Sequence, residues 1–148
     1  MTMTDAELAA HLAKAAGRIL LQVRGASAVS DQALGKAGDE AANRFLVDAI
    51  RAARPKDGLL SEEEQDNHER LKQSRVWIID PVDGTREYGE RRSDWAVHVG
   101  LAIDGVATVG AVALPALDLV LRTDQPLTVS PPPHRLRYPP SLWLPPNP

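Results

Sequence analysis

Proline placement limits where this chain can form a folded domain. Nine of its twelve prolines lie in the last twenty-four residues, "QPLTVSPPPHRLRYPPSLWLPPNP". Proline lacks a backbone N–H, and its ring disrupts helix interiors and central strands. A packed domain is therefore expected over residues 1–122, followed by an extended or disordered proline-rich tail over residues 123–148. The tail could instead be a ligand for an aromatic groove, but no clean repeat supports that alternative.

Two helices are predicted near the N-terminus. Between residues 5 and 24, one apolar stripe recurs at spacings of three and four, formed by Leu8, Leu12, Ala15, Ile19 and Val23. A loop containing glycine and serine is expected over residues 25–38, and a second helix from about Asp39 to Arg54. The residues of the second helix that are expected to face inward are Ala42, Phe45, Leu46, Ala49 and Ile50.

The rest of the domain is predicted to form strands. The run "VWIID" (76–80) is apolar and of strand length, so we expect a central strand buried on both faces. The runs "WAVHVGLAI" and "VATVGAVAL" flank Asp104-Gly105, which predicts a β-hairpin. "DLVLR" adds a further strand. The predicted fold class is α+β, with two N-terminal helices packed on an antiparallel sheet.

Composition excludes several classes of function. The formal net charge of −3 argues against binding a nucleic-acid polymer through a broad basic surface. The chain has no cysteine, which excludes disulfides, thiolate zinc sites and a cysteine nucleophile. No run approaches the ~18 apolar residues that a membrane span needs, and the polar start lacks a secretory signal. We therefore expect a cytoplasmic protein with no membrane partner.

The stretch "DPVDGT" (80–85) carries the clearest chemistry. Pro81 fixes its own φ and restricts Asp80 to extended conformations. Asp80 and Asp83 can then point at one place together with the Val82 carbonyl, and such oxygen ligands suit Mg²⁺ or Mn²⁺. The alternative is a simple strand-to-helix turn in which Asp83 caps the helix.

Two further observations bear on a phosphate site. Gly84 lets a phosphate approach the backbone, and a helix starting at Thr85 would favour an anion there. A metal pair beside such a helix start is suited to phosphoryl hydrolysis. Residues 57–69 are strongly acidic, which indicates either a solvated loop or part of a divalent-cation site. The four histidines lie far apart in the sequence, and none is assigned a role.

These residues carry a family resemblance. "LLSEEE" followed by "WIIDPVDGT" resembles the inositol monophosphatase superfamily of Mg²⁺-dependent phosphomonoesterases. "DGTREY" is closer to its 3'(2'),5'-bisphosphate nucleotidase (CysQ-like) branch, which acts on 3'-phosphoadenosine 5'-phosphate. The resemblance implies the N-terminal half of the inositol monophosphatase/fructose-1,6-bisphosphatase fold, two or more Mg²⁺ ions and inhibition by Li⁺. The implied partner is a small phosphorylated metabolite: 3'-phosphoadenosine 5'-phosphate, an inositol phosphate or a sugar bisphosphate.

The resemblance also implies roles for individual residues. The metal ligands would be Glu62, Asp80, the Val82 carbonyl and Asp83. The catalytic residues would be Glu63, which supports the ligands, and Thr85 with Asp39, which relay a proton from the attacking water. The substrate phosphate would be held by Gly84, Thr85 and Arg86. Asp39 could instead be an ordinary N-cap, and Arg86 a solvated surface arginine.

The resemblance ends near residue 122, whereas members of the superfamily are nearly twice as long. Their second half supplies a Trp-Asp motif that completes the second metal site, and Trp143 in the tail has no such acid beside it. We therefore expect a truncated or frame-shifted phosphatase with exposed apolar sheet surface, which a homodimer could cover. The alternatives are an inactive metal- or phosphate-binding fragment and an interaction module that uses the tail.

Overall fold

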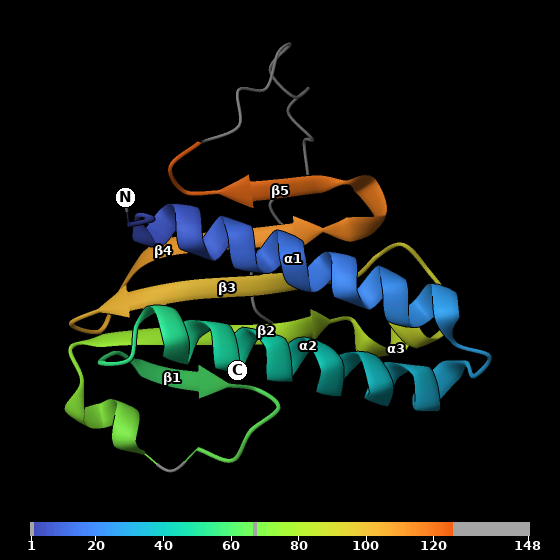
Figure 1. Ribbon diagram of the computed structural model, residues 1–148, viewed down its shortest axis with the longest axis horizontal. Helices are drawn as coiled ribbons and strands as arrows, with labels where there is room; N and C mark the ends of the chain where they lie inside the picture. The colour runs from blue at the N-terminus through green and yellow to red at the C-terminus, as the bar shows by residue number, and fades with distance from the viewer. Residues whose placement is uncertain (1, 67, 126–148) are drawn as a thin grey trace, which may run out of the picture.

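A computed structural model describes residues 2–66 and 68–125, and it places the long helices on one face of a single sheet (Figure 1). The helices are α1 (Asp5–Ala26), α2 (Asp31–Ala53), α3 (Thr85–Gly89) and the 3-10 turns η1 (Glu69–Lys72) and η2 (Pro115–Leu117). The strands are β1 (Gly58–Ser61), β2 (Arg75–Asp83), β3 (Ala96–Ile103), β4 (Val106–Leu114) and β5 (Leu119–Arg122). Residues 126–148 of the predicted tail lie outside the described part, so the tail stays a prediction.

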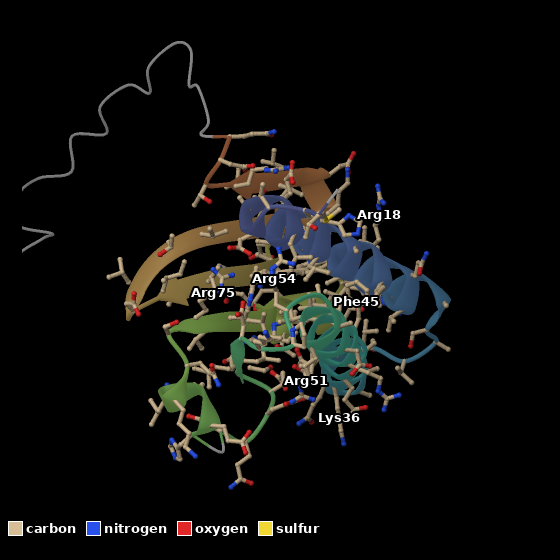
Figure 2. The ribbon with its side chains drawn as sticks, turned by 60° about the vertical axis from the view of Figure 1, so that its left-hand side comes forward. Arg18, Lys36, Phe45, Arg51, Arg54 and Arg75 are labelled. Carbon is tan, nitrogen blue, oxygen red and sulfur yellow. The ribbon has the colours of Figure 1, made fainter. Side chains whose placement is uncertain are left out.

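Helix α1 agrees with the sequence prediction, and its first turn ties three elements together. Thr4 and Glu7 form a reciprocal capping box, with Thr4 N–H donating to Glu7 Oε2 at 2.8 Å. Asp5 accepts hydrogen bonds from Arg54 at the end of α2 (3.0 Å) and Arg75 of β2 (2.9 Å). Figure 2 shows these two arginines close to each other where α1, α2 and β2 meet.

The loop between the helices covers only residues 27–30, because α1 extends to Ala26 and α2 begins at Asp31, so the prediction of a loop over residues 25–38 is wrong at both ends. Gly35 and Gly38 suggested a loop, but both lie inside α2. They are glycines because α3 passes very close to α2 at these two positions. A Cβ on Gly35 would lie 2.9 Å from Thr85 Cγ2 and 3.1 Å from Thr85 O. A Cβ on Gly38 would lie 2.5 Å from Tyr88 Cε1. Glycine is therefore required at both positions by space, and the contact brings α2 against Thr85.

The strand order is β1-β2-β3-β4-β5. As predicted, β2 to β5 pair antiparallel, and β3 and β4 form a hairpin through Asp104 and Gly105, both with positive φ. Strand β1 was not predicted, because four residues give too short a pattern, and it pairs parallel to β2. The sheet is therefore mixed, and its parallel edge carries the acidic segment that follows β1.

The two faces of the sheet differ. Trp77 and Ile79 are buried beneath the helices, whereas Ile78 is 46% exposed on the opposite face. The prediction that this strand is buried on both faces is therefore wrong for the described residues. Ile78 of β2 pairs with Gly100 of β3, and Gly100 pairs with Gly110 of β4. The open face is therefore apolar at this point, with no side chain at the two glycines. Within the described residues, neither long helix has an apolar stretch able to cross a membrane.

The fit of α2 against α3 can be tested by adding a single methyl group. Gly35→Ala should destabilise the chain by about 1–3 kcal/mol, because the stiff, branched Thr85 side chain and its backbone must move. Gly25→Ala is the matched control, since nothing lies within 4 Å of a Cβ there, and it should gain up to about 1 kcal/mol of helix propensity. Urea unfolding measures both, and a stabilised Gly35→Ala would contradict this packing.

Candidate active site

Asp80 stands near the end of β2 with an unsatisfied carboxylate oxygen. Its Oδ1 atom is buried and has no hydrogen-bond partner among the described residues. Burial raises the pKa of Asp80 to about 7, helped by the adjacent Glu62 carboxyl and by the charges of Asp83 and Asp39. Such a carboxyl is stabilised by a proton or by a bound cation, which fits the prediction that Asp80 ligates a metal.

The backbone beyond Asp80 is irregular and leaves the sheet after Asp83. The register with β3 shifts between Asp80 and Asp83, and Val82 is buried. Gly84 has a φ of 90°, a left-handed conformation that favours glycine. Its carbonyl then accepts the Tyr88 N–H at 2.9 Å, which starts α3. The expected helix start at Thr85 is confirmed, but the alternative in which Asp83 caps this helix is wrong, because the cap residue is Gly84 and no side chain of the described residues caps the first turn.

Thr85 and Asp39 come from different elements and meet at this turn. Thr85 Oγ1 lies 3.3 Å from Asp39 Oδ1 and 3.1 Å from the Val82 carbonyl oxygen. Because a hydroxyl has one proton, it can donate to only one of them at a time. Burial, together with the charge of Glu63, raises the pKa of Asp39 to about 7. Ionised Asp39 accepts the Thr85 proton, whereas protonated Asp39 leaves Thr85 free to donate to Val82.

Asp39 lies in the interior of α2, so the alternative that it is an N-cap is wrong. The cap position is Ser30, before the first turn. Asp39 is 9% exposed, which is unusual for a carboxylate. Its burial follows from the glycine contacts that draw α2 against α3.

The two glutamates follow β1 in an exposed turn. The Glu62 N–H donates to Ile79 O at 3.2 Å, which continues the pairing of β1 with β2. Glu62 and Asp80 border a hollow of about 320 Å³ on the open side of the sheet. Glu63 borders a larger cleft on the helix side, together with Asp39 and Thr85. The structure therefore places the predicted ligand and its supporting acid on two sides of one turn.

Asp83 is exposed and has a partner that the sequence did not suggest. His98 Nε2 lies 3.1 Å from Asp83 Oδ2, and His98 sits opposite Asp80 on β3. Alternation along β3 puts His98 on the open face, but the register of β2 with β3 cannot be read from the sequence. Among the described residues, no three carboxylate or histidine side chains form a ready metal site. Glu62, Asp80 and Asp83 carry oxygen atoms of the kind that a hard cation prefers, but they do not form a finished cage.

Comparison with known proteins identifies the family. The chain matches the inositol monophosphatase family over residues 3–127, most of its 148 residues. The chain belongs to this family. Members of the inositol monophosphatase family are metal-dependent, in agreement with the oxygen donors at the end of β2.

Several relatives can be named. The 3'-phosphoadenosine 5'-phosphate phosphatase of Mycobacterium leprae is 51% identical over 125 residues, which cover 77% of this chain and 46% of that protein. CysQ of Escherichia coli K12, a 3'(2'),5'-bisphosphate nucleotidase, is 30% identical over 117 residues, covering 74% and 48%. Inositol monophosphatase-II of Staphylococcus aureus has a similar structure, with a TM-score of 0.71 at 26% identity, covering 78% and 43%.

Two further solved structures, both of SaIMPase-II, hold 2'AMP and inositol monophosphate. The chain therefore shares the inositol monophosphatase fold over the part that matches. It spans about half the length of the curated relatives it matches.

The helix-side cleft of this family member has a volume of about 960 Å³. Besides Asp39, Glu63 and Thr85, it is bordered by Lys36, Asn43 and Arg86. Lys36 and Asn43 were missed in the sequence, Lys36 because its segment was expected to be a loop. The Arg86 side chain is 81% exposed and pairs with Glu90 at 2.9 Å. Arg86 thus borders the cleft while its charge is shared with solvent and Glu90, and both predicted roles stay open.

The pKa of Asp80 predicts how stability depends on pH without divalent ions. Its folded pKa of about 7 exceeds the ordinary value of 3.8, so folded protein holds a proton that the unfolded chain releases. The contribution of Asp80 to stability is therefore present below about pH 4 and is lost as pH rises to about 7. In Asp80→Asn, the free energy of unfolding should fall less as pH rises to about 7, and it should exceed the wild-type value at neutral pH. Urea unfolding at several pH values measures both effects.

Asp48→Asn, at an exposed position of α2, is the control and should leave the pH dependence unchanged. An Asp80→Asn variant with the same pH dependence as the wild type would show that Asp80 is not held protonated.

Proposed function

We propose that this chain carries the metal- and phosphate-binding half of a Mg²⁺-dependent phosphomonoesterase, most similar to enzymes that remove the 3'-phosphate of 3'-phosphoadenosine 5'-phosphate. The observation that carries the proposal is the buried, unpartnered Asp80 Oδ1 beside Glu62. The 51% identity to a mycobacterial phosphatase of that name supports the substrate. Residues 1–122 would form the phosphatase domain, and its substrate would be a metabolite of the cytoplasm.

The donor set suits Mg²⁺. Glu62, Asp80 and the Val82 carbonyl would hold one ion, and Asp80 with Asp83 a second. Bound Mg²⁺ supplies positive charge to the phosphoryl oxygens and lowers the pKa of water. Li⁺ inhibition is expected from the family. Because the chain covers 46% of the M. leprae protein, we propose that a further ligand of the second ion lies outside the match.

Two side chains of this chain, Thr85 and Asp39, would accept the proton of the attacking water. Ionised Asp39 accepts the Thr85 hydroxyl proton, and the Thr85 oxygen can then accept a proton from the attacking water. Water oxygen bonds to phosphorus, the ester P–O bond breaks, and the departing oxygen takes up a proton from solvent. The products are inorganic phosphate and the alcohol. The charge of Glu63 raises the pKa of Asp39, which favours transfer of the Thr85 proton to Asp39, and Asp39 then releases it to solvent before the next turnover.

The substrate phosphate would lie at the start of α3. Gly84 and Thr85 offer backbone N–H groups where the chain leaves the sheet, and Arg86 stands at the edge of the cleft. A cleft of about 960 Å³ is at the upper end of the range for small-molecule sites, so a nucleotide would fit as readily as a sugar phosphate.

A second candidate is hydrolysis of inositol phosphates or sugar bisphosphates. It is favoured by the structural likeness to SaIMPase-II, which was crystallised with inositol monophosphate. A third is metal and phosphate binding without turnover, favoured by the match to under half of the relatives. A homodimer that covers the open face of the sheet is compatible with all three.

Phosphate release tests the proposal. The purified chain with Mg²⁺ should release phosphate from 3'-phosphoadenosine 5'-phosphate faster than from inositol 1-phosphate or fructose 1,6-bisphosphate. Asp80→Asn should lower the rate by more than about 100-fold, because losing even an outer partner of a metal ligand costs about 10–100-fold.

The outcomes separate the candidates. A different substrate ranking would favour the second candidate, and folded protein that binds Mg²⁺ without releasing phosphate would favour the third. Release that survives in Asp80→Asn would contradict the whole scheme.

A further inference from the structure

Asn43 joins α2 to the acidic turn after β1. It lies one helical turn after Asp39, and its side chain reaches across to the turn. Asn43 Oδ1 accepts a hydrogen bond from Ser61 Oγ at 2.5 Å, and Nδ2 donates to Glu64 Oε1 at 3.2 Å. Ser61 is 5% exposed, so its contact with Asn43 is largely shielded from water. The amide therefore holds both ends of the turn that carries the glutamates.

Ser61 extends this link into the turn. Its Oγ, which donates to Asn43, accepts the Glu63 N–H at 3.2 Å, and its carbonyl accepts the Glu64 N–H at 3.2 Å. The Ser61 hydroxyl thus uses its one proton and one of its lone pairs. A continuous chain of hydrogen bonds runs from Asn43 through Ser61 to the backbone of Glu63.

This turn has little else to hold it against α2. Glu62, Glu63 and Glu64 are exposed, so no apolar packing of their side chains fixes the turn. The negative charges of Glu62 and Glu63 act on Asp39, and like charges repel one another. A neutral amide can donate and accept at this point without adding another negative charge.

We infer that Asn43 is a positioning residue of the candidate metal site, holding the Glu62–Glu64 turn so that its acids face Asp80 and Asp39. This inference rests on the proposed function, because it takes Glu62 to be a cation ligand. Arg51 also approaches Glu64, at 3.8 Å, but its side chain is 65% exposed. Figure 2 shows Arg51 projecting from α2. Arg51 has no hydrogen bond to Ser61 among the described contacts, so it offers a control on the same glutamate.

Metal affinity distinguishes positioning from simple stabilisation. Mn²⁺ binding is followed by the electron paramagnetic resonance signal of the free ion, with thermal unfolding of each variant measured in parallel. Asn43→Ala should weaken Mn²⁺ binding by about tenfold, the scale on which outer partners tune metal sites. Arg51→Ala should change it by less than about twofold, as expected for an exposed contact.

Ser61→Ala tests the same link from the other side and leaves Asn43 intact. It should weaken Mn²⁺ binding similarly, and the double variant should bind no worse than the weaker single one, because both changes break one chain of hydrogen bonds. Folded Asn43→Ala and Ser61→Ala proteins that bind Mn²⁺ as tightly as the wild type, while Asp80→Asn loses binding, would overturn the inference alone. A wild-type chain that binds no Mn²⁺ would overturn the proposed metal site as well.

Discussion

Repulsion among acids is the constraint on which this site depends. Asp80 and Asp39 are withdrawn from water, and the nearby charge of Glu62 raises the pKa of both carboxyls further above the ordinary value. Such an arrangement costs stability unless a proton or a cation neutralises it. Three features of the remaining structure keep the acids together. They are the core between the helices and the sheet, the glycine contacts of α2 with α3, and the hydrogen bonds from Asn43 to the turn after β1.

The same arrangement divides the chemistry between two sides of one turn. Asp80 and Glu62 face the open side, where oxygen donors gather, whereas Thr85 and Asp39 face the helix-side cleft, where a proton can move. The backbone of Val82 and Gly84 connects them, because the Val82 carbonyl is within reach of the Thr85 hydroxyl. The charge of Asp39 also acts on Asp80 directly, so the protonation of the two sides is linked.

Local patterns predicted much of the fold, and long-range contacts account for the rest. The periodicity of α1 and the Asp104-Gly105 turn are local, and both predictions are confirmed. The early start of α2 was missed because Gly35 suggested a loop. Gly35 is glycine because of its contact with α3, which lies far away in the sequence and is not visible in a local pattern. Resemblance to a family suggested the pair of Asp39 and Thr85. The contacts of His98 with Asp83 and of Asn43 with Ser61 depend on how separate elements lie side by side, so the sequence alone could not reveal them.

The number of protons released on metal binding shows whether Asp80 is held protonated until a cation replaces its proton. At about pH 6, below the pKa of Asp80 of about 7, Mg²⁺ must displace the proton that neutralises this carboxyl. Calorimetric titration in buffers of different ionisation enthalpy counts the protons released. We expect proton release from the wild-type chain at about pH 6, little release well above pH 7, and weak binding in Asp80→Asn. Mg²⁺ binding without proton release, or equal binding by Asp80→Asn, would contradict this expectation.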